Sequence, residues 1–305
     1  MPIKTFVAVP ALESGARVAL VAPAGPLQRP EDLPRAEENV RSMGWEAVIG
    51  NHVNARMSYL AGSDTQRLND LNRALADPKI DAIWCLRGGY GMTRLLEDID
   101  YAALSRSPKT IIGYSDVTAL HAAIGIRCGL TTFHGPTARE LLTDFSRASF
   151  DAAIVQRRDS GGSAPAAREL RAGKATGRLA GGNLSVLTAL AGTPFAPDLR
   201  DTIVILEDIN EPVYRVDRML QQLRQSGMLA GCSAIVFGDC TRCPEDASGG
   251  GRSLDEVLTE VAAWLGVPCI AGVPIGHIDD QWTLPLGALA ELDSDSRTLT
   301  VTSFN

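Results

Sequence analysis

The chain has 305 residues, of which 45% are hydrophobic and 21% are charged, and its formal net charge is −7. This composition is typical of an ordinary folded protein, and the length is sufficient for two domains. Because no basic cluster is present, neither nucleic acid nor an anionic membrane is an expected partner. The stretch Met1–Pro10 lacks an apolar core of signal-peptide length, and no stretch approaches the roughly 20 apolar residues of a membrane span. We therefore expect a cytoplasmic protein that does not enter a membrane.

The six cysteines are Cys85, Cys128, Cys232, Cys240, Cys243 and Cys269. In a chain without an export signal, they are expected to be reduced thiols. Cys240 and Cys243 form a C-x-x-C pattern, but a zinc site requires a second pair of ligands, and none is apparent in the sequence. The cysteines therefore predict neither a metal site nor a redox centre.

Strand-like and helix-like segments alternate through the first half of the chain. The expected strands are 17–22, 45–49, 80–86, 110–112 and 130–133, and the expected helices are 30–43, 63–76, 92–96 and 117–124. Repeated βα units predict an α/β fold with a mostly parallel sheet and flanking helices, of the flavodoxin-like or amidotransferase-like kind. Ligands of such sheets bind beyond the carboxyl ends of the strands.

Composition changes at residues 156–175, which are rich in Gly, Ser, Pro and Ala and predict a linker. This divides the chain into an N-terminal α/β domain, residues 1–155, and a smaller C-terminal α/β domain with more β character, residues 176–305. In the second half, the expected strands are 177–180, 202–206, 234–237 and 269–273, the expected helices are 184–190, 213–225 and 254–265, and a hairpin is expected at 288–302.

The segment around Ser115 is the strongest local indication of chemistry. Residues 110–112 are typical of a buried strand, Gly113 ends it, and residues 117–124 favour a helix. A serine at a strand-to-helix turn projects from the sheet beside the next backbone N–H, as in a nucleophile elbow. The pattern lacks only the last glycine of G-x-S-x-G. A second interpretation stays open, in which Ser115 or Asp116 simply caps the helix.

A serine nucleophile requires a base and a carboxylate that orients the base. Among the four histidines, His134 and His277 follow expected strands and are candidate bases, whereas His52 and His121 fit a surface loop and a helix. Glu207 ends an apolar strand, where a carboxylate would be rigidly held. The alternative is a charged strand end that reaches solvent.

Two other kinds of site are compatible with the sequence. The segment Arg87-Gly-Gly-Tyr-Gly91 could hold an anion, because successive glycine amides can face one oxygen, or it could be only a tight turn. It matches no phosphate-binding loop, so nucleotide binding is not favoured. The acidic and histidine side chains of the second half could hold a hard or borderline cation, although their spacing matches no metal motif. The residues considered are Glu207, Asp208, Glu211, His277, Asp279 and Asp280.

Six segments, in this order, resemble the LD-carboxypeptidase family of serine peptidases, and the resemblance covers essentially the whole chain. They are Arg87-Gly-Gly-Tyr-Gly91, Gly113-Tyr-Ser-Asp116, His134-Gly-Pro136, Gly181-Gly-Asn183, Leu206-Glu-Asp208 with Tyr214-Arg-Val-Asp-Arg218, and Gly276-His277 with Thr283-Leu-Pro285. The resemblance implies a two-domain hydrolase with the catalytic triad Ser115, Glu207 and His277, no cofactor, and often a homodimer. The implied reaction removes the terminal D-alanine from a muropeptide tetrapeptide during cell-wall recycling in the cytoplasm.

The resemblance also suggests roles around the triad. The amide of Asp116, with that of Gly88 or Gly89, would stabilise the oxyanion. Arg87 could bind a substrate carboxylate, because its planar guanidinium suits one, or it could be structural. The side chains that could line the site, or else pack in the core or at the rim, are Tyr90 and Trp282.

Two alternative functions remain open from the sequence. Some members of the family cleave peptide-nucleotide antibiotic conjugates and confer self-immunity, and Trp282 could serve there as a stacking group. The other alternative is a non-catalytic binding protein with two lobes. Because two domains imply a hinge, Ser115 and His277 could also lie apart.

Overall fold

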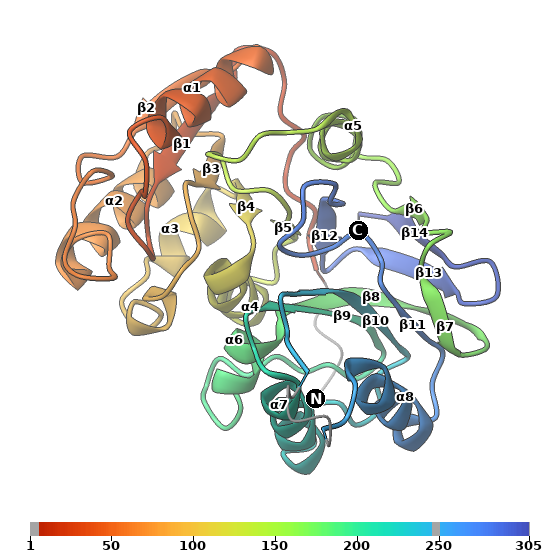
Figure 1. The fold of residues 1–305 in the computed structure, drawn as a ribbon. Coiled ribbons are helices and arrows are strands. Elements are labelled where there is room, and N and C mark those ends of the chain that lie inside the picture. The colour runs from red at the N-terminus through yellow and green to blue at the C-terminus, as the bar shows by residue number, and fades with distance from the viewer. Residues whose placement is uncertain (1–5, 246–250, 305) are drawn as a thin grey trace.

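The computed structural model describes residues 6–245 and 251–304. Part of the N-terminal stretch, residues 1–5, lies outside the described residues. Figure 1 shows two sheets, one built mainly by the first half of the chain and surrounded by α1 to α4, the other built by the second half with α6 to α8 along one face. No helix in the described part of the chain is both long enough and apolar enough to span a bilayer.

The first sheet has the strand order β12-β5-β4-β3-β1-β2. Its strands are β1 (Arg17–Val21), β2 (Glu46–Ile49), β3 (Ala82–Cys85), β4 (Thr110–Gly113), β5 (Thr132–His134) and β12 (Leu284–Leu286). The strands β1 to β5 pair in parallel, whereas β12 pairs antiparallel to β5. The helices of this half are α1 (Asp32–Ser42), α2 (Asp64–Ala76), α3 (Tyr101–Arg106), α4 (Thr118–Arg127) and α5 (Asp144–Asp151). The mostly parallel α/β arrangement expected from the βα alternation is confirmed.

The second sheet has the strand order β6-β14-β13-β8-β9-β10-β11-β7. Its strands are β6 (Gly162–Ser163), β7 (Arg168–Arg171), β8 (Lys174–Asn183), β9 (Thr202–Ile209), β10 (Ala234–Thr241), β11 (Cys269–Ala271), β13 (Leu289–Asp293) and β14 (Thr298–Ser303). The helices are α6 (Leu184–Ala189), α7 (Val213–Gln225) and α8 (Leu254–Leu265). Parallel pairing is confined to β8 through β11, and antiparallel strands complete the sheet on both sides.

Most expected elements are present, but several differ, and β12 is among the elements that were not expected. The expected helix 92–96 is a single 3-10 turn at Met92–Arg94, and α5 was not expected. The segment 156–175, expected to be a linker, also contributes β6 and β7, which pair with β14 and β11 at opposite edges of the second sheet. Composition could not reveal this, because edge pairing depends on strands distant in sequence. The division of the chain into domains at this segment stays a prediction.

The two halves are joined by the loop between β11 and β12, which is bound to α5. Ser146 Oγ donates a 2.8 Å hydrogen bond to the carbonyl oxygen of Asp279 and accepts one of 2.9 Å from the amide of Gln281. Ser149 Oγ accepts a 2.8 Å hydrogen bond from the amide of Thr283. Since β12 then joins the first sheet, this loop of the second half is fixed to the first half at several points.

Candidate active site

Ser115 lies at the turn between β4 and α4, where the sequence places a nucleophile elbow. Its φ is 63°, in the left-handed region that residues other than glycine rarely adopt. Backbone strain of this kind costs on the order of 1–3 kcal/mol and is concentrated at functional sites. A helix-capping residue normally has an extended backbone, and no described side chain caps the start of the turn or of α4. The backbone therefore favours the elbow over the capping interpretation.

The glycine-rich loop after β3 lies against Ser115, because β3 and β4 are adjacent in the sheet. A methyl group on the Gly88 Cα would come within 2.7 Å of Ser115 Cβ, 2.9 Å of Ser115 Oγ and 3.2 Å of the Asp116 amide nitrogen. Contacts under 3.0 Å are too close for a real side chain. The buried Gly88 backbone thus borders the space above the serine, whereas Gly89 is exposed.

The side chain of Asp116 fixes this loop from below. Its Oδ2 accepts a 2.8 Å hydrogen bond from the amide of Met92, just beyond the loop. Burial raises the pKa of Asp116 to about 6, although the Met92 hydrogen bond acts in the opposite direction. The carboxylate therefore has a structural partner, and the Asp116 amide remains beside Gly88.

Glu207 and His277 form a close hydrogen-bonded pair. Glu207 lies on β9 and is 1% exposed, and its Oε2 is 2.7 Å from His277 Nδ1. Burial acts to lower the pKa of His277, but the hydrogen bond and the charge of Glu207 outweigh it, and the pKa is raised. With Nδ1 engaged, Nε2 is the ring nitrogen left to exchange a proton. The alternative of a Glu207 side chain in solvent is wrong.

Asn183 holds the other oxygen of this carboxylate. At the end of β8, its Nδ2 donates hydrogen bonds of 3.2 Å to Glu207 Oε1 and 3.1 Å to Asp208 Oδ1. Its backbone N–H donates a 2.9 Å hydrogen bond to Oγ1 of Thr118, the first residue of α4. From the sequence, Asn183 had no role beyond its place in a family motif, although an asparagine between a strand and a helix is a capping signal, and its side chain also caps α6.

Tyr114 brings the two halves of the site together. It immediately precedes Ser115 in the chain, and its ring centroid is 4.8 Å from that of His277. The His277 imidazole therefore lies against the residue that precedes Ser115 in the chain. That Ser115 and His277 act together stays a prediction.

The other histidines are less suited to act as a base. His134 is completely buried, burial lowers its pKa to about 3, and neither ring nitrogen has a hydrogen-bond partner among the described residues. Burial likewise lowers the pKa of His121 to about 4, and its Nε2 lies 2.8 Å from the carbonyl oxygen of Gly113. His52 is paired with Asp70 at 2.9 Å.

The three residues predicted to bind the substrate or line the site have different environments. Arg87 is half-buried and donates a 2.8 Å hydrogen bond to the carbonyl oxygen of Pro26. Tyr90 is 48% exposed and lies edge-on to Tyr59, at 5.6 Å between centroids. Trp282 is 2% exposed and packs in the apolar core behind the second sheet. Trp282 therefore does not line the site, because its loop turns inward to join β12.

A cation site of the kind considered from the sequence requires several ligands close together. Within residues 6–245 and 251–304, no group of three or more His, Cys, Asp or Glu side chains is arranged to hold a metal ion.

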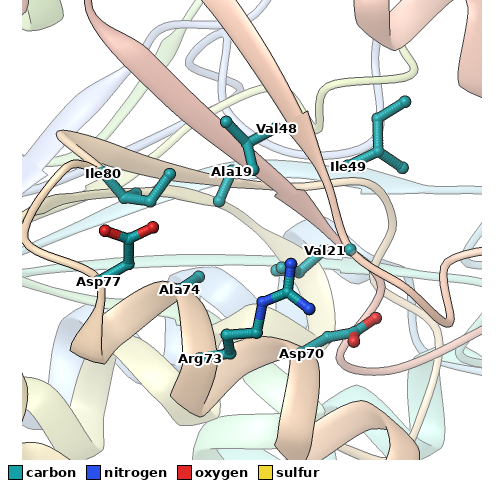
Figure 2. A pocket seen from close by; sticks show the side chains of 10 residues that line it. Ala19, Val21, Val48, Ile49, Asp70, Arg73, Ala74, Asp77 and Ile80 are labelled. Carbon is teal, nitrogen blue, oxygen red and sulfur yellow. The ribbon is translucent and has the colours of Figure 1, made fainter.

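A separate small cavity lies between α2 and the edge of the first sheet, where Asp70 and Asp77 lie on either side of Arg73 (Figure 2). Its volume is about 30 Å³, which is enough for about one water molecule but not for a peptide.

Comparison with known proteins shows which family the chain belongs to. The model of the LD-carboxypeptidase N-terminal domain matches residues 18–135, and that of the LD-carboxypeptidase C-terminal domain matches residues 176–292. The chain belongs to the LD-carboxypeptidase family. Among the relatives of this LD-carboxypeptidase chain, the murein tetrapeptide carboxypeptidase of Pseudomonas aeruginosa is 36% identical over 299 residues, which are 92% of this chain and 94% of the relative.

Solved structures of other LD-carboxypeptidase family proteins have the same fold. Muramoyltetrapeptide carboxypeptidase from Oxalobacter formigenes is 32% identical with a TM-score of 0.82, over 93% of this chain and 97% of that one. The microcin C7 self-immunity protein MccF, in complex with aspartyl sulfamoyl adenosine, is 27% identical with a TM-score of 0.87, over 99% of both chains. The family thus includes proteins named for two different substrates.

We expect the Gly88→Ala variant to lose at least about a hundredfold in kcat/KM, because its methyl group would fill the space above Ser115. Hydrolysis assays and thermal unfolding would measure the effect. Gly125→Ala is the matched control. Gly125 lies within α4, and a methyl group there would meet the Phe6 ring at an ordinary contact distance of 3.4 Å. Full activity of the Gly88→Ala variant would show that the loop does not border the reacting atoms.

We expect Asp116→Asn to flatten the pH dependence of stability. Because the folded pKa of about 6 exceeds the ordinary 3.8, the folded state binds more protons between these values, and stability falls as pH rises through them. The full effect of this one group at pH 7 is about 3 kcal/mol. Denaturant unfolding at a series of pH values would measure it. Parallel curves for wild type and variant would contradict the assignment.

Proposed function

We propose that this chain is a serine carboxypeptidase that releases the terminal D-alanine from muropeptide tetrapeptides by cleaving an L,D bond. The observation that carries the proposal is the 2.7 Å contact between Glu207 and His277, whose ring lies against Tyr114, the residue before the strained Ser115. The named relatives that act on murein peptides support this substrate class. The reaction would belong to peptidoglycan recycling.

The proposed mechanism uses the side chains of the chain alone. His277 Nε2 takes the proton from Ser115 as Oγ attacks the scissile carbonyl carbon, and Glu207 holds the imidazolium that forms. The tetrahedral intermediate collapses as His277 gives its proton to the amine of D-alanine, which leaves. Water, deprotonated by the same histidine, then hydrolyses the acyl-enzyme.

The backbone beside Ser115 is proposed as the oxyanion hole. The Asp116 amide lies next to Gly88, and an amide of Gly88 or Gly89 would supply the second donor. One donor of this kind is typically worth about 3–4 kcal/mol in the transition state. Since the Asp116 side chain is bound to Met92, the amide at this position is held in a fixed direction.

Arg87 is the proposed partner of the substrate's terminal carboxylate. Burial lowers the pKa of its guanidinium, and the positive charges of Arg139 and Arg56 act in the same direction, with Asp32 opposing them. Arg139 pairs with Asp32 at 3.6 Å, whereas Arg87 forms no ion pair with a carboxylate of the described residues, so its guanidinium suits an anionic ligand. Tyr90, exposed on the same loop, would contact the substrate beside it.

A second candidate is hydrolysis of peptide-nucleotide antibiotic conjugates. It is favoured by the TM-score of 0.87 to the complex of MccF with aspartyl sulfamoyl adenosine. The tryptophan considered for stacking on an adenylate, Trp282, is buried, so the exposed Tyr59 and Tyr90 would have to serve. The third candidate is a binding protein without catalysis. Cytoplasmic location and a homodimer stay predictions.

We expect wild-type protein, and not Ser115→Ala, to release D-alanine from a tetrapeptide that ends in diaminopimelate–D-alanine. The loss should be at least about a thousandfold in turnover, because no other described hydroxyl occupies the elbow. Release of free D-alanine would be measured, with thermal unfolding as the check on folding. Release by neither protein would favour the antibiotic conjugate, to be assayed next, and failure there would favour the binding protein.

We expect kcat/KM to fall as pH decreases through a value above the ordinary histidine pKa, because His277 must be neutral to accept the proton and its pKa is raised. In Glu207→Gln this limb should move to lower pH, since the charge that stabilises the imidazolium is lost, and kcat should fall. The pH profiles of both proteins would be compared. If His134→Ala is inactive while His277→Ala is active, the base has been misassigned.

A further inference from the structure

A second carboxylate, Glu140, is connected to His277 through Tyr114. The Tyr114 hydroxyl donates a 2.9 Å hydrogen bond to Glu140 Oε1, and Thr137 Oγ1 donates another of 2.9 Å to the same oxygen. Gln281 Nε2 lies 3.4 Å from Glu140 Oε2, and Gln281 belongs to the loop that carries His277. Glu140 thus contacts both the ring beside the imidazole and the loop that positions it.

Tyr114 lies against one side of the His277 ring. The two ring centroids are 4.8 Å apart with 55° between the planes. The ring centroid of His134 is 5.9 Å from that of Tyr114. Tyr114 is 6% exposed, so its ring has little freedom to move. Its hydroxyl, fixed by Glu140, prevents rotation of the ring out of this contact.

Glu207 alone does not determine the orientation of His277. One hydrogen bond at Nδ1 leaves the imidazole free to pivot about that contact, which would move Nε2 relative to Ser115. A ring packed against the imidazole restricts this motion, and small displacements of a catalytic group have large effects on rate. The Tyr114 contact supplies this restriction from the N-terminal half, whereas Glu207 acts from β9.

The charges around His277 come from several elements. Glu207 and Asp208 on β9 and Glu140 after β5 all favour the protonated imidazole. His134, whose pKa is lowered to about 3, is neutral. Arg139 lies near both Tyr114 and Glu140, and its positive charge acts to lower the pKa of each. Burial raises the pKa of Glu140, while its hydrogen bonds from Tyr114 and Thr137 act to lower it.

We propose that Tyr114 and Glu140 are positioning residues for His277, with the Tyr114 ring fixing the imidazole and Glu140 fixing both the ring and the histidine loop. The assignment rests on the proposed function only in taking His277 as the base. Neither residue needs to touch the substrate. The pair forms a second support for the base that is separate from the Glu207–Asn183 contact.

The test compares Glu140→Gln and Tyr114→Phe with a matched control, Tyr101→Phe. Tyr101 is also a partly buried tyrosine of the first half, and its hydroxyl donates a 2.7 Å hydrogen bond to the Leu96 carbonyl oxygen. NMR titration of the His277 ring in each full-length protein, assigned with His277→Gln, requires no substrate. Kinetic pH profiles on a murein tetrapeptide give the second readout.

In Glu140→Gln, we expect the His277 titration and the acid limb of kcat/KM to move together to lower pH, because a charge that favours the imidazolium is lost. We expect kcat to fall about tenfold in both site variants with KM little changed, since the altered step is the orientation of the base. The Tyr101→Phe variant should match wild type. Thermal unfolding shows whether each variant is folded.

Two outcomes separate this inference from the proposed function. An unchanged His277 titration in Glu140→Gln, with kcat as in wild type for both variants, would overturn the positioning role. A wild-type protein inactive on murein peptides, with the His277 titration shifted in Glu140→Gln, would reject the substrate and support the positioning role.

Discussion

The hydrogen bond between Glu207 and His277 is the contact on which the site depends. It joins a buried carboxylate on the second sheet to a loop that is itself bound to α5 of the first half. Breaking one partner of such a buried pair would leave the other uncompensated, which is costly in a low-dielectric interior. The contact therefore requires both sheets to be formed and correctly placed. Hydrogen bonds of Asn183 and of the α5 serines hold them in this placement.

A second constraint acts on the serine itself. Ser115 keeps a left-handed backbone because β4, the turn and α4 are packed around it, and Gly88 provides the space that a side chain there would fill. Backbone strain at Ser115 and the absence of a side chain at Gly88, its neighbour in space, are both unfavourable for stability. Their combination at the carboxyl ends of adjacent strands is the arrangement that an exposed nucleophile requires.

The sequence predicted elements best where periodicity was strong. The helices α7 and α8 begin and end at the predicted residues, because each has a continuous apolar stripe and clear boundary signals. The segment 156–175 was understood only in part, since β6 and β7 form by pairing with edges that composition does not encode. Trp282 was considered as a wall of the site, but the inward turn toward β12 places it in the core.

By itself, the sequence determined the α/β class, the family and the serine turn, because these depend on local patterns and on motif order. It also named Glu207 and His277 as candidates, and only the resemblance joined them with Ser115 as a triad. The tertiary structure decided that Glu207 is buried against His277, that His134 is a buried ring with a lowered pKa, that Tyr114 is hydrogen-bonded to Glu140, and that Asn183 is hydrogen-bonded to Glu207. These relations join residues far apart in the chain, and burial and contact across sheets exist only once the chain has folded.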